Sequence, residues 1–122
     1  MIEITDVKGL LIDLEGVLYS DNKLIPGSID VIKKLRKHNL KLRFLTNTTT
    51  TPRNLIFNKL QDFGFNIQEE EIFTPIIATK NYLKDNKTKK IALFTNIEII
   101  EEFTDYEITQ KNPDVVIMGD IY

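Results

Sequence analysis

Asp13 and Glu15 end an apolar stretch near the amino terminus, and Gly16 follows them. Two carboxylates about 4 Å apart repel by about 4 kcal/mol at an effective dielectric constant of about 20, so a close pair needs a compensating interaction. A bound Mg²⁺, protonation of one partner, or divergence of both side chains into water would provide it. Phosphoryl transfer uses the first two: an aspartate takes the phosphoryl group, a cation neutralises its oxygens, and a second acid protonates the leaving group. The pair therefore indicates either this chemistry or the polar rim of a turn.

A second polar group, Thr46 and Asn47, ends another apolar stretch. A threonine hydroxyl and the backbone N–H groups beside it could bind phosphate oxygens. The structural alternatives are that Thr46 only ends a strand and that Asn47 forms an Asx turn. The threonines at 48–51 are expected to serve the start of a helix. The residues themselves leave both interpretations open.

The stretches around these groups alternate between strand-like and helix-like patterns. Short apolar runs predict strands, and apolar residues at helical spacing predict helices. The expected strands cover 7–12, 40–46, 69–75, 89–95 and 114–119, and the expected helices cover 29–38, 52–63, 75–86 and 97–103. This order predicts an α/β fold, a Rossmann-like and mostly parallel sheet with helices on both faces. Ligands of such sheets bind beyond the carboxyl ends of the strands, so we expect the two polar groups to lie side by side.

Three helix starts carry capping signals. Ser28 is the expected N-cap of the first helix. Thr51-Pro52 and Thr74-Pro75 each give an N-cap followed by proline at the first helical position, where its missing N–H has no intrahelical partner to lose.

The composition excludes several classes of protein. The chain has 122 residues, 42% of them hydrophobic, which is typical of one folded domain and too apolar for a disordered chain. Its net charge of −2 favours neither nucleic acid nor a membrane surface as a partner. Cysteine is absent and His38 is the only histidine, so disulfides, thiolate metal sites and a Ser-His-Asp triad are not expected. His38 is expected to complement the dipole of the first helix. No apolar run reaches the length of a signal-peptide core or a membrane span, and we expect a cytoplasmic protein.

Four stretches carry a family resemblance: "IDLEGVLY", "IPGSIDVIKKLRK", "LRFLTNTTTTPRNLIFNKLQDFGF" and "EEEIFT". In order and content they resemble the haloacid dehalogenase-like hydrolases. The resemblance is to the nitrophenylphosphatase and nucleotide phosphatase-like subgroup (subfamily IIA), and is closest to its phospholysine phosphohistidine inorganic pyrophosphate phosphatase branch. It runs from about Lys8 to the end of the chain and matches only the amino-terminal half of these proteins.

The resemblance implies a role for each site residue. Asp13 matches the nucleophile, which becomes an aspartyl-phosphate and binds Mg²⁺. Glu15 stands where most members have a second aspartate, whose backbone carbonyl binds Mg²⁺ and whose side chain is the general acid and base. Thr46 matches the hydroxyl that binds the transferring phosphoryl group, with Asn47 beside it, and Gly16 matches the glycine of a tight turn. Since glutamate is one methylene longer, the acid role of Glu15 is the less supported of its two roles.

The resemblance also implies a domain organisation and a function. Residues 1–74 resemble the amino-terminal part of the hydrolase core, and residues 75–122 resemble the beginning of an α/β cap. The lysine and the later acidic pair that complete such a site have no counterpart here. The expected function is Mg²⁺-dependent hydrolysis of a small phosphorylated substrate, impaired or absent in a chain of this length. A homodimer is one expected assembly.

Several alternatives compete with this interpretation. A receiver domain has a similar length and strand order, but it would carry its phosphorylated aspartate after the third strand, where this chain has "FTP". A non-catalytic remnant that binds phosphate or a partner protein stays open. "VVIMGDIY" resembles a final metal motif, but no second acid follows Asp120 at the right spacing, so we do not expect a ligand there. "YSDNKL" is expected to form an exposed turn, in a region that is a flap beside the site in the family.

Overall fold

A computed structural model describes residues 4–121 and divides into two compact units. The first unit contains the chain up to Thr46 together with Arg53–Phe73, and the second contains Asn47–Pro52 together with the chain from Thr74. The elements of the first unit are η1 (Ile4–Asp6), β1 (Gly9–Asp13), β2 (Tyr19–Ser20), β3 (Lys23–Leu24), α1 (Ser28–Lys37), β4 (Lys41–Leu45), α2 (Arg53–Phe63), η2 (Glu69–Glu71) and β5 (Ile72–Phe73). Those of the second are α3 (Pro75–Asp85), β6 (Lys90–Phe94), α4 (Ile97–Ile100), η3 (Glu101–Phe103), β7 (Glu107–Ile108) and β8 (Val115–Met118).

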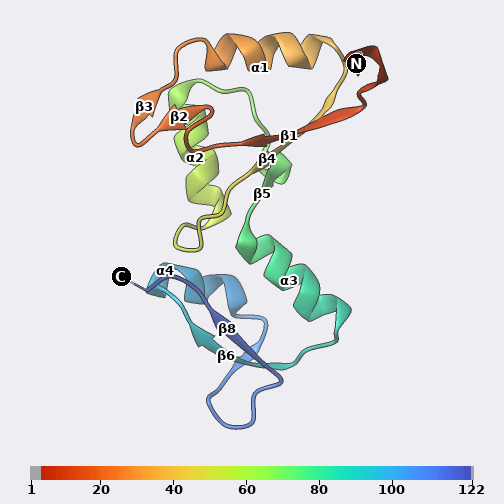
Figure 1. Ribbon diagram of the computed structural model, residues 1–122. Coiled ribbons are helices and arrows are strands. Elements are labelled where there is room, and N and C mark those ends of the chain that lie inside the picture. The colour runs from red at the N-terminus through yellow and green to blue at the C-terminus, as the bar shows by residue number, and fades with distance from the viewer. Residues whose placement is uncertain (1–3, 122) are drawn as a thin grey trace. The chain divides into compact units, whose positions relative to one another are not determined.

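The first unit is a parallel three-stranded sheet in the order β1-β4-β5, packed against two helices (Figure 1). Leu42 and Phe44 of β4 are buried and belong to one core cluster with Ile32 of α1 and Leu60 of α2. Both crossover helices therefore pack on the same face of this sheet. A short antiparallel hairpin, β2–β3, follows β1.

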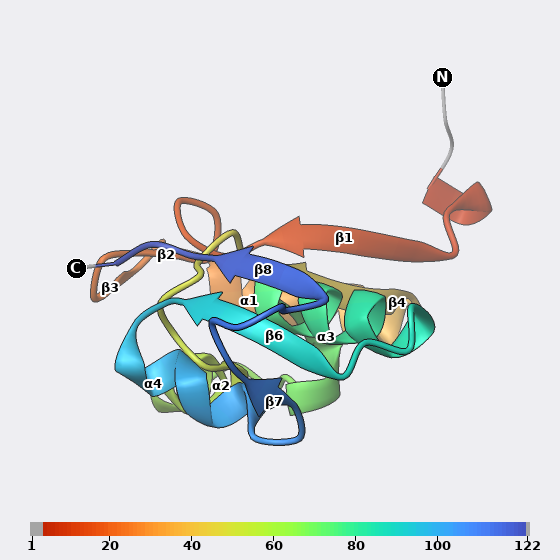
Figure 2. The same ribbon diagram turned by 90° about the horizontal axis from the view of Figure 1, so that it is seen from below.

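The second unit is another parallel three-stranded sheet, in which β6 lies between β7 and β8 (Figure 2). Its core joins the sheet to both neighbouring helical segments, with Leu83 from α3, Ile91 from β6, and Ile99 and Phe103 from α4 and η3. Within the residues described, no helix combines the length and hydropathy needed to cross a bilayer.

The parallel α/β class expected from the sequence is confirmed, and each expected strand and helix is present in the expected order. The strands form two separate three-stranded sheets, one in each unit. The arrangement differs from the expectation in one respect, because the two helices of the first unit share one face of its sheet. The hairpin strands β2 and β3 and the strand β7 were not expected, because two residues are too few to show an alternating pattern.

The helix starts test the capping predictions. Thr74 caps α3 as expected, with its side chain accepting a hydrogen bond of 3.2 Å from the backbone N–H of Ile77, and Pro75 is the first helical residue. The prediction for Ser28 was wrong. The N-cap of α1 is Gly27, at a φ of 84°, and Ser28 is the first helical residue, with its hydroxyl buried and without a hydrogen-bond partner in the described structure. The prediction that Pro52 is the first residue of the second helix was wrong by one position, because α2 begins at Arg53 and Pro52 directly precedes it.

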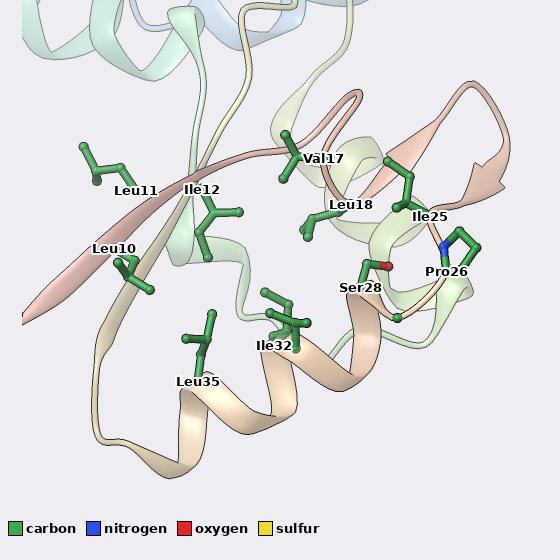
Figure 3. Close-up of a pocket in the computed structure, with 12 residues that line it drawn as sticks. Leu10, Leu11, Ile12, Val17, Leu18, Ile25, Pro26, Ser28, Ile32 and Leu35 are labelled. Carbon is green, nitrogen blue, oxygen red and sulfur yellow. The ribbon is translucent and has the colours of Figure 1, made fainter. Parts of the chain in front are cut away.

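An apolar groove of about 400 Å³ separates β1 from α1 (Figure 3). Leu10, Ile12 and Leu35 line it, and the hydroxyl of Ser28 is among its few polar atoms. The strand beside it, β1, pairs only with β4 within residues 4–121, so its other edge is open. Leu11 on this strand is 73% exposed, which leaves an apolar surface next to unpaired backbone groups.

A bidentate ion pair joins the end of α1 to the segment before β5. The Arg36 guanidinium donates to both carboxylate oxygens of Glu71, at 2.7 and 2.6 Å, and to the backbone carbonyl of Asn66. Burial raises the pKa of Glu71, but hydrogen bonds from Arg36 and the backbone of Gln68, together with the guanidinium charge, outweigh burial and lower the net pKa. This contact fixes η2 and, through it, the strand that borders Thr46.

We expect Glu71→Gln to reduce the free energy of unfolding by about 1–2 kcal/mol near neutral pH, because it leaves a partly buried guanidinium without its charged partner. A carboxylate whose pKa is lowered on folding stabilises the fold above its ordinary value of 4.5, and this stabilisation is lost as the pH falls through the folded value. Denaturant titrations should therefore show the difference shrinking in acid. Glu70→Gln, on an exposed neighbour, is the control, and equal stability of the two variants at neutral pH would contradict the prediction.

Candidate active site

Asp13 is the last residue of β1 and its side chain is exposed. Its Oδ1 accepts a hydrogen bond of 2.8 Å from the backbone N–H of Leu14, which also donates to the carbonyl of Leu45 at 3.1 Å. Asp13 pairs in register with Leu45. The carboxylate is therefore fixed at the strand end and directly beside the end of β4.

Thr46 follows β4 immediately and is half-buried. Its backbone N–H donates to the carbonyl of Phe73 at the end of β5. Because β1 and β4 are parallel and Asp13 pairs with the residue before Thr46, the structure brings Asp13 and Thr46 to the same edge of one sheet, as expected from the sequence. Asn47 is exposed and begins the short segment that belongs to the second unit.

The turn after β1 depends on Gly16, whose φ is 82°. Its N–H donates to the carbonyl of Tyr19 at 2.7 Å, and the N–H groups of Val17 and Leu18 both donate to the carbonyl of Leu14. A Cβ at Gly16 would meet no atom within 4 Å, so glycine is required by the backbone conformation and not by crowding. This agrees with the tight turn expected at Gly16.

Gly16→Ala should reduce the free energy of unfolding by about 1–2 kcal/mol, the cost of the left-handed conformation for a residue with a Cβ. Gly16→Asn should cost less, since asparagine tolerates this conformation better. Thermal and denaturant unfolding of both variants and the parent chain give the order of their free energies of unfolding. An alanine variant as stable as the parent chain would show that the turn adopts another conformation.

Glu15 is exposed and directs one carboxylate oxygen at the hairpin that follows it. Its Oε1 accepts a hydrogen bond of 2.7 Å from the backbone N–H of Asp21, in the turn between β2 and β3. The carbonyl of Asp21 accepts a hydrogen bond of 2.7 Å from Lys59 Nζ on α2. We call residues Tyr19–Leu24 the flap hairpin. Its turn is thus bound by side chains on both sides.

Tyr19 is a buried neighbour of both acids. Burial raises the pKa of Tyr19, and the negative charges of Glu15 and then Asp13 raise it further. The two carboxylates therefore share one electrostatic environment around the Tyr19 phenol. Neither Tyr19 nor Lys59 could be identified from the sequence: the exposed-turn pattern located the hairpin, but nothing in a helical lysine signals a contact with it.

The acidic groups of this site are few. Within residues 4–121, no group of three or more His, Cys, Asp or Glu side chains could hold a metal ion. Mg²⁺, however, is commonly held by one or two carboxylates, with water and substrate phosphate as its other ligands. The exposed Asp13 carboxylate and the backbone carbonyl of Glu15 suit such an incomplete ligand set.

Asp120 has partners in the second unit. The hydroxyl of Thr49 donates to Asp120 Oδ2 at 3.0 Å, and the backbone N–H of Asp120 donates to the same hydroxyl oxygen at 3.0 Å. A Cβ at the adjacent Gly119 would lie 3.2 Å from Thr95 Cγ2. These contacts attach the segment 47–52 to the end of β8.

Comparison with known proteins decides the family. The family model for haloacid dehalogenase-like hydrolases matches residues 10–109. The chain belongs to this family. Asp13 and Thr46 both lie within the matched part of the haloacid dehalogenase-like hydrolase, as does the whole first sheet apart from its first residue.

Individual relatives of this hydrolase agree. It is 34% identical over 119 residues to the phospholysine phosphohistidine inorganic pyrophosphate phosphatase of Xenopus laevis, covering 93% of this chain and 43% of the relative. It is 30% identical over 113 residues to the haloacid dehalogenase-like hydrolase domain-containing protein 2 of Mus musculus, covering 93% and 42%.

Solved structures give the same result for the fold. NagD from E. coli K-12 superposes with a TM-score of 0.85 at 27% identity, over 94% of this chain and 47% of that chain. The p-nitrophenyl phosphatase of Archaeoglobus fulgidus also gives 0.85, at 26% identity, over 94% and 46%. The hydrolase chain therefore spans less than half the length of these proteins.

Proposed function

We propose that this chain carries the nucleophile and part of the phosphate-binding site of a Mg²⁺-dependent phosphatase that acts on a small phosphorylated substrate through an aspartyl-phosphate. The observation that carries the proposal is the register of β1 and β4, which sets the exposed Asp13 beside Leu45, the residue directly before Thr46. Two of the relatives above are named as phosphatases. We propose that the second unit is the beginning of a cap domain. We also propose that the protein is cytoplasmic and forms a homodimer.

The proposed reaction has two steps at Asp13. A carboxylate oxygen of Asp13 attacks phosphorus, forming an O–P bond while the bond to the leaving-group oxygen breaks. Glu15, protonated, gives its proton to that oxygen, and its carboxylate then accepts a proton from the water that attacks the aspartyl-phosphate. This second attack releases inorganic phosphate and restores the Asp13 carboxylate.

The remaining groups bind and orient the phosphoryl group. The Thr46 hydroxyl, with Asn47 beside it, is proposed to bind phosphoryl oxygens as charge moves onto them. Mg²⁺ would neutralise that charge, held by the Asp13 carboxylate and the backbone carbonyl of Glu15. In the relatives, the part of the chain outside this match would supply further Mg²⁺ ligands.

Asp13→Asn should abolish Mg²⁺-dependent release of phosphate from p-nitrophenyl phosphate, a loss of more than about 100-fold, because asparagine cannot form the acyl-phosphate. Asp62→Asn, on the exposed side of α2, is the matched control. Release that is unaffected by Asp13→Asn, or unaffected by removal of Mg²⁺ with a chelator, would contradict the proposal.

Glu15→Gln tests proton transfer separately. If the Glu15 carboxylate protonates the leaving group, the variant should be slowed by about 10²-fold or more with alkyl phosphates and less with p-nitrophenyl phosphate, whose leaving group needs little protonation. Rate measurements on both substrates give the comparison. Equal rates for the variant and the parent chain would exclude the acid role.

A second candidate function is a non-catalytic remnant that binds phosphate or a partner. The small number of acidic groups in the described site favours it. Absence of any Asp13-dependent phosphate release, together with Asp13-dependent binding of Mg²⁺ measured by calorimetry, would support this candidate.

A further inference from the structure

The turn of the flap hairpin is bound through both backbone polar groups of Asp21, its N–H and its carbonyl. The backbone N–H of Asp21 donates to Glu15 Oε1 at 2.7 Å, and its carbonyl accepts from Lys59 Nζ at 2.7 Å. Both hydrogen bonds involve a charged side chain, which makes them stronger than bonds between neutral groups. Glu15 precedes the hairpin and Lys59 lies on α2, so the turn is held from two separate elements of the first unit.

Asp21 occupies a conformation that needs such support. Its φ is 53°, in the left-handed region that residues with a Cβ seldom adopt. The hairpin itself has only two residues in each strand, and an isolated hairpin of this size is not stable in water. The side-chain contacts are therefore needed to define its position.

Lys59 lies over the rings of Tyr19 and Phe63, and these contacts hold its ammonium near Asp21. Its ammonium lies 4.4 Å from the centroid of the Tyr19 ring and 6.0 Å from that of Phe63, and the two rings stack with centroids 5.4 Å apart. A cation over an aromatic face is stabilised by the ring quadrupole. Since Tyr19 is the first residue of the hairpin, Lys59 contacts both the base and the turn of the same element.

We propose that Glu15 and Lys59 form a clasp that fixes the flap hairpin beside the carboxyl end of β1, and that Lys59 is thereby a positioning residue of the active site. The effect on catalysis rests on the proposed function. Glu15 Oε1 is held by Asp21, so the direction of the carboxylate is set. One oxygen would position the flap, and the other could exchange a proton with substrate.

The length of Glu15 is part of this proposal. An aspartate at the same position is one methylene shorter, and the bond to Asp21 is already a close contact of 2.7 Å across six residues of chain. Glu15→Asp should therefore weaken the clasp although it keeps the charge. Glu15→Gln keeps an acceptor oxygen at the same reach and should retain the clasp while removing the exchangeable proton.

Hydrogen exchange at the Asp21 amide measures the clasp directly, by NMR on the free chain without substrate. Lys59→Met retains the apolar stem over Tyr19 and removes the ammonium, and it should raise the exchange rate about 3- to 10-fold, as for loss of one hydrogen bond. Glu15→Asp should have a similar effect. Lys59→Arg and Glu15→Gln should stay within about 2-fold of the parent chain. Lys34→Met, which removes the same charge from the exposed surface of α1, is the control.

The result is independent of the proposed activity. An Asp21 amide that exchanges equally in Lys59→Met and Lys34→Met would overturn the clasp, and so would an unprotected amide in the parent chain. If Lys59→Met fails to fold, Lys59→Gln gives the same comparison, and Glu15→Asp tests the other contact. Absence of phosphate release would contradict the proposed function without affecting the exchange result. Where activity is measurable, Lys59→Met should lower kcat and Lys59→Arg should restore it.

Discussion

The in-register parallel pairing of β1 with β4 is the constraint on which the site depends. It spans Gly9↔Lys41 to Asp13↔Leu45, so a shift of one residue would move Asp13 away from Thr46 and would also turn Leu10 and Ile12 off the face they share with Leu42 and Phe44. The packing of the core therefore protects the register, and the register places the chemistry. An apolar core with no functional side chain in it determines where the two polar strand ends meet.

The second constraint acts after the strand ends. Gly16 turns the chain sharply, and the hairpin that follows returns beside the strand end that carries Asp13. Tyr19, the first residue of this hairpin, is buried and stacks on Phe63 of α2, which links the hairpin to the core. Glu15 and Lys59 bind the hairpin turn at Asp21. Glu15 thus binds the hairpin turn and is also a member of the acidic pair. Asp13 differs from it, because its carboxylate accepts a hydrogen bond from the adjacent backbone N–H of Leu14.

The sequence was sufficient for features that depend on local patterns. Asp13 at the end of an apolar run, Thr74-Pro75 at a helix start and Gly16 at a tight turn each have a local signature, and the structure agrees with them. It was insufficient where tertiary contacts decide. Ser28 is of a residue type that often caps helices, but Gly27 takes the N-cap position, at a left-handed φ of 84° that glycine adopts without a steric cost.

Other differences have the same origin. Periodicity does not report which strands pair, so only the family resemblance led us to expect a core and a cap with separate sheets. The contact of Lys59 with Asp21 joins residues 38 positions apart, and no local pattern indicates it. The open edge of β1 and the apolar groove beside it are also invisible in the sequence, because the exposed Leu11 and the half-buried Leu10 have the same residue type. The roles proposed for Asp13, Glu15, Thr46 and Asn47 come from the family resemblance, because a local pattern alone left a structural interpretation open for each group.

Locating the covalent phosphoryl group shows whether Asp13 is the nucleophile. The chain would be incubated with p-nitrophenyl phosphate and Mg²⁺, quenched in acid, and digested for peptide mass spectrometry. We expect one phosphoryl group on the peptide that contains Asp13, and none in the Asp13→Asn variant. A phosphoryl group on another residue, or turnover with no covalent phosphoryl group on Asp13, would contradict it.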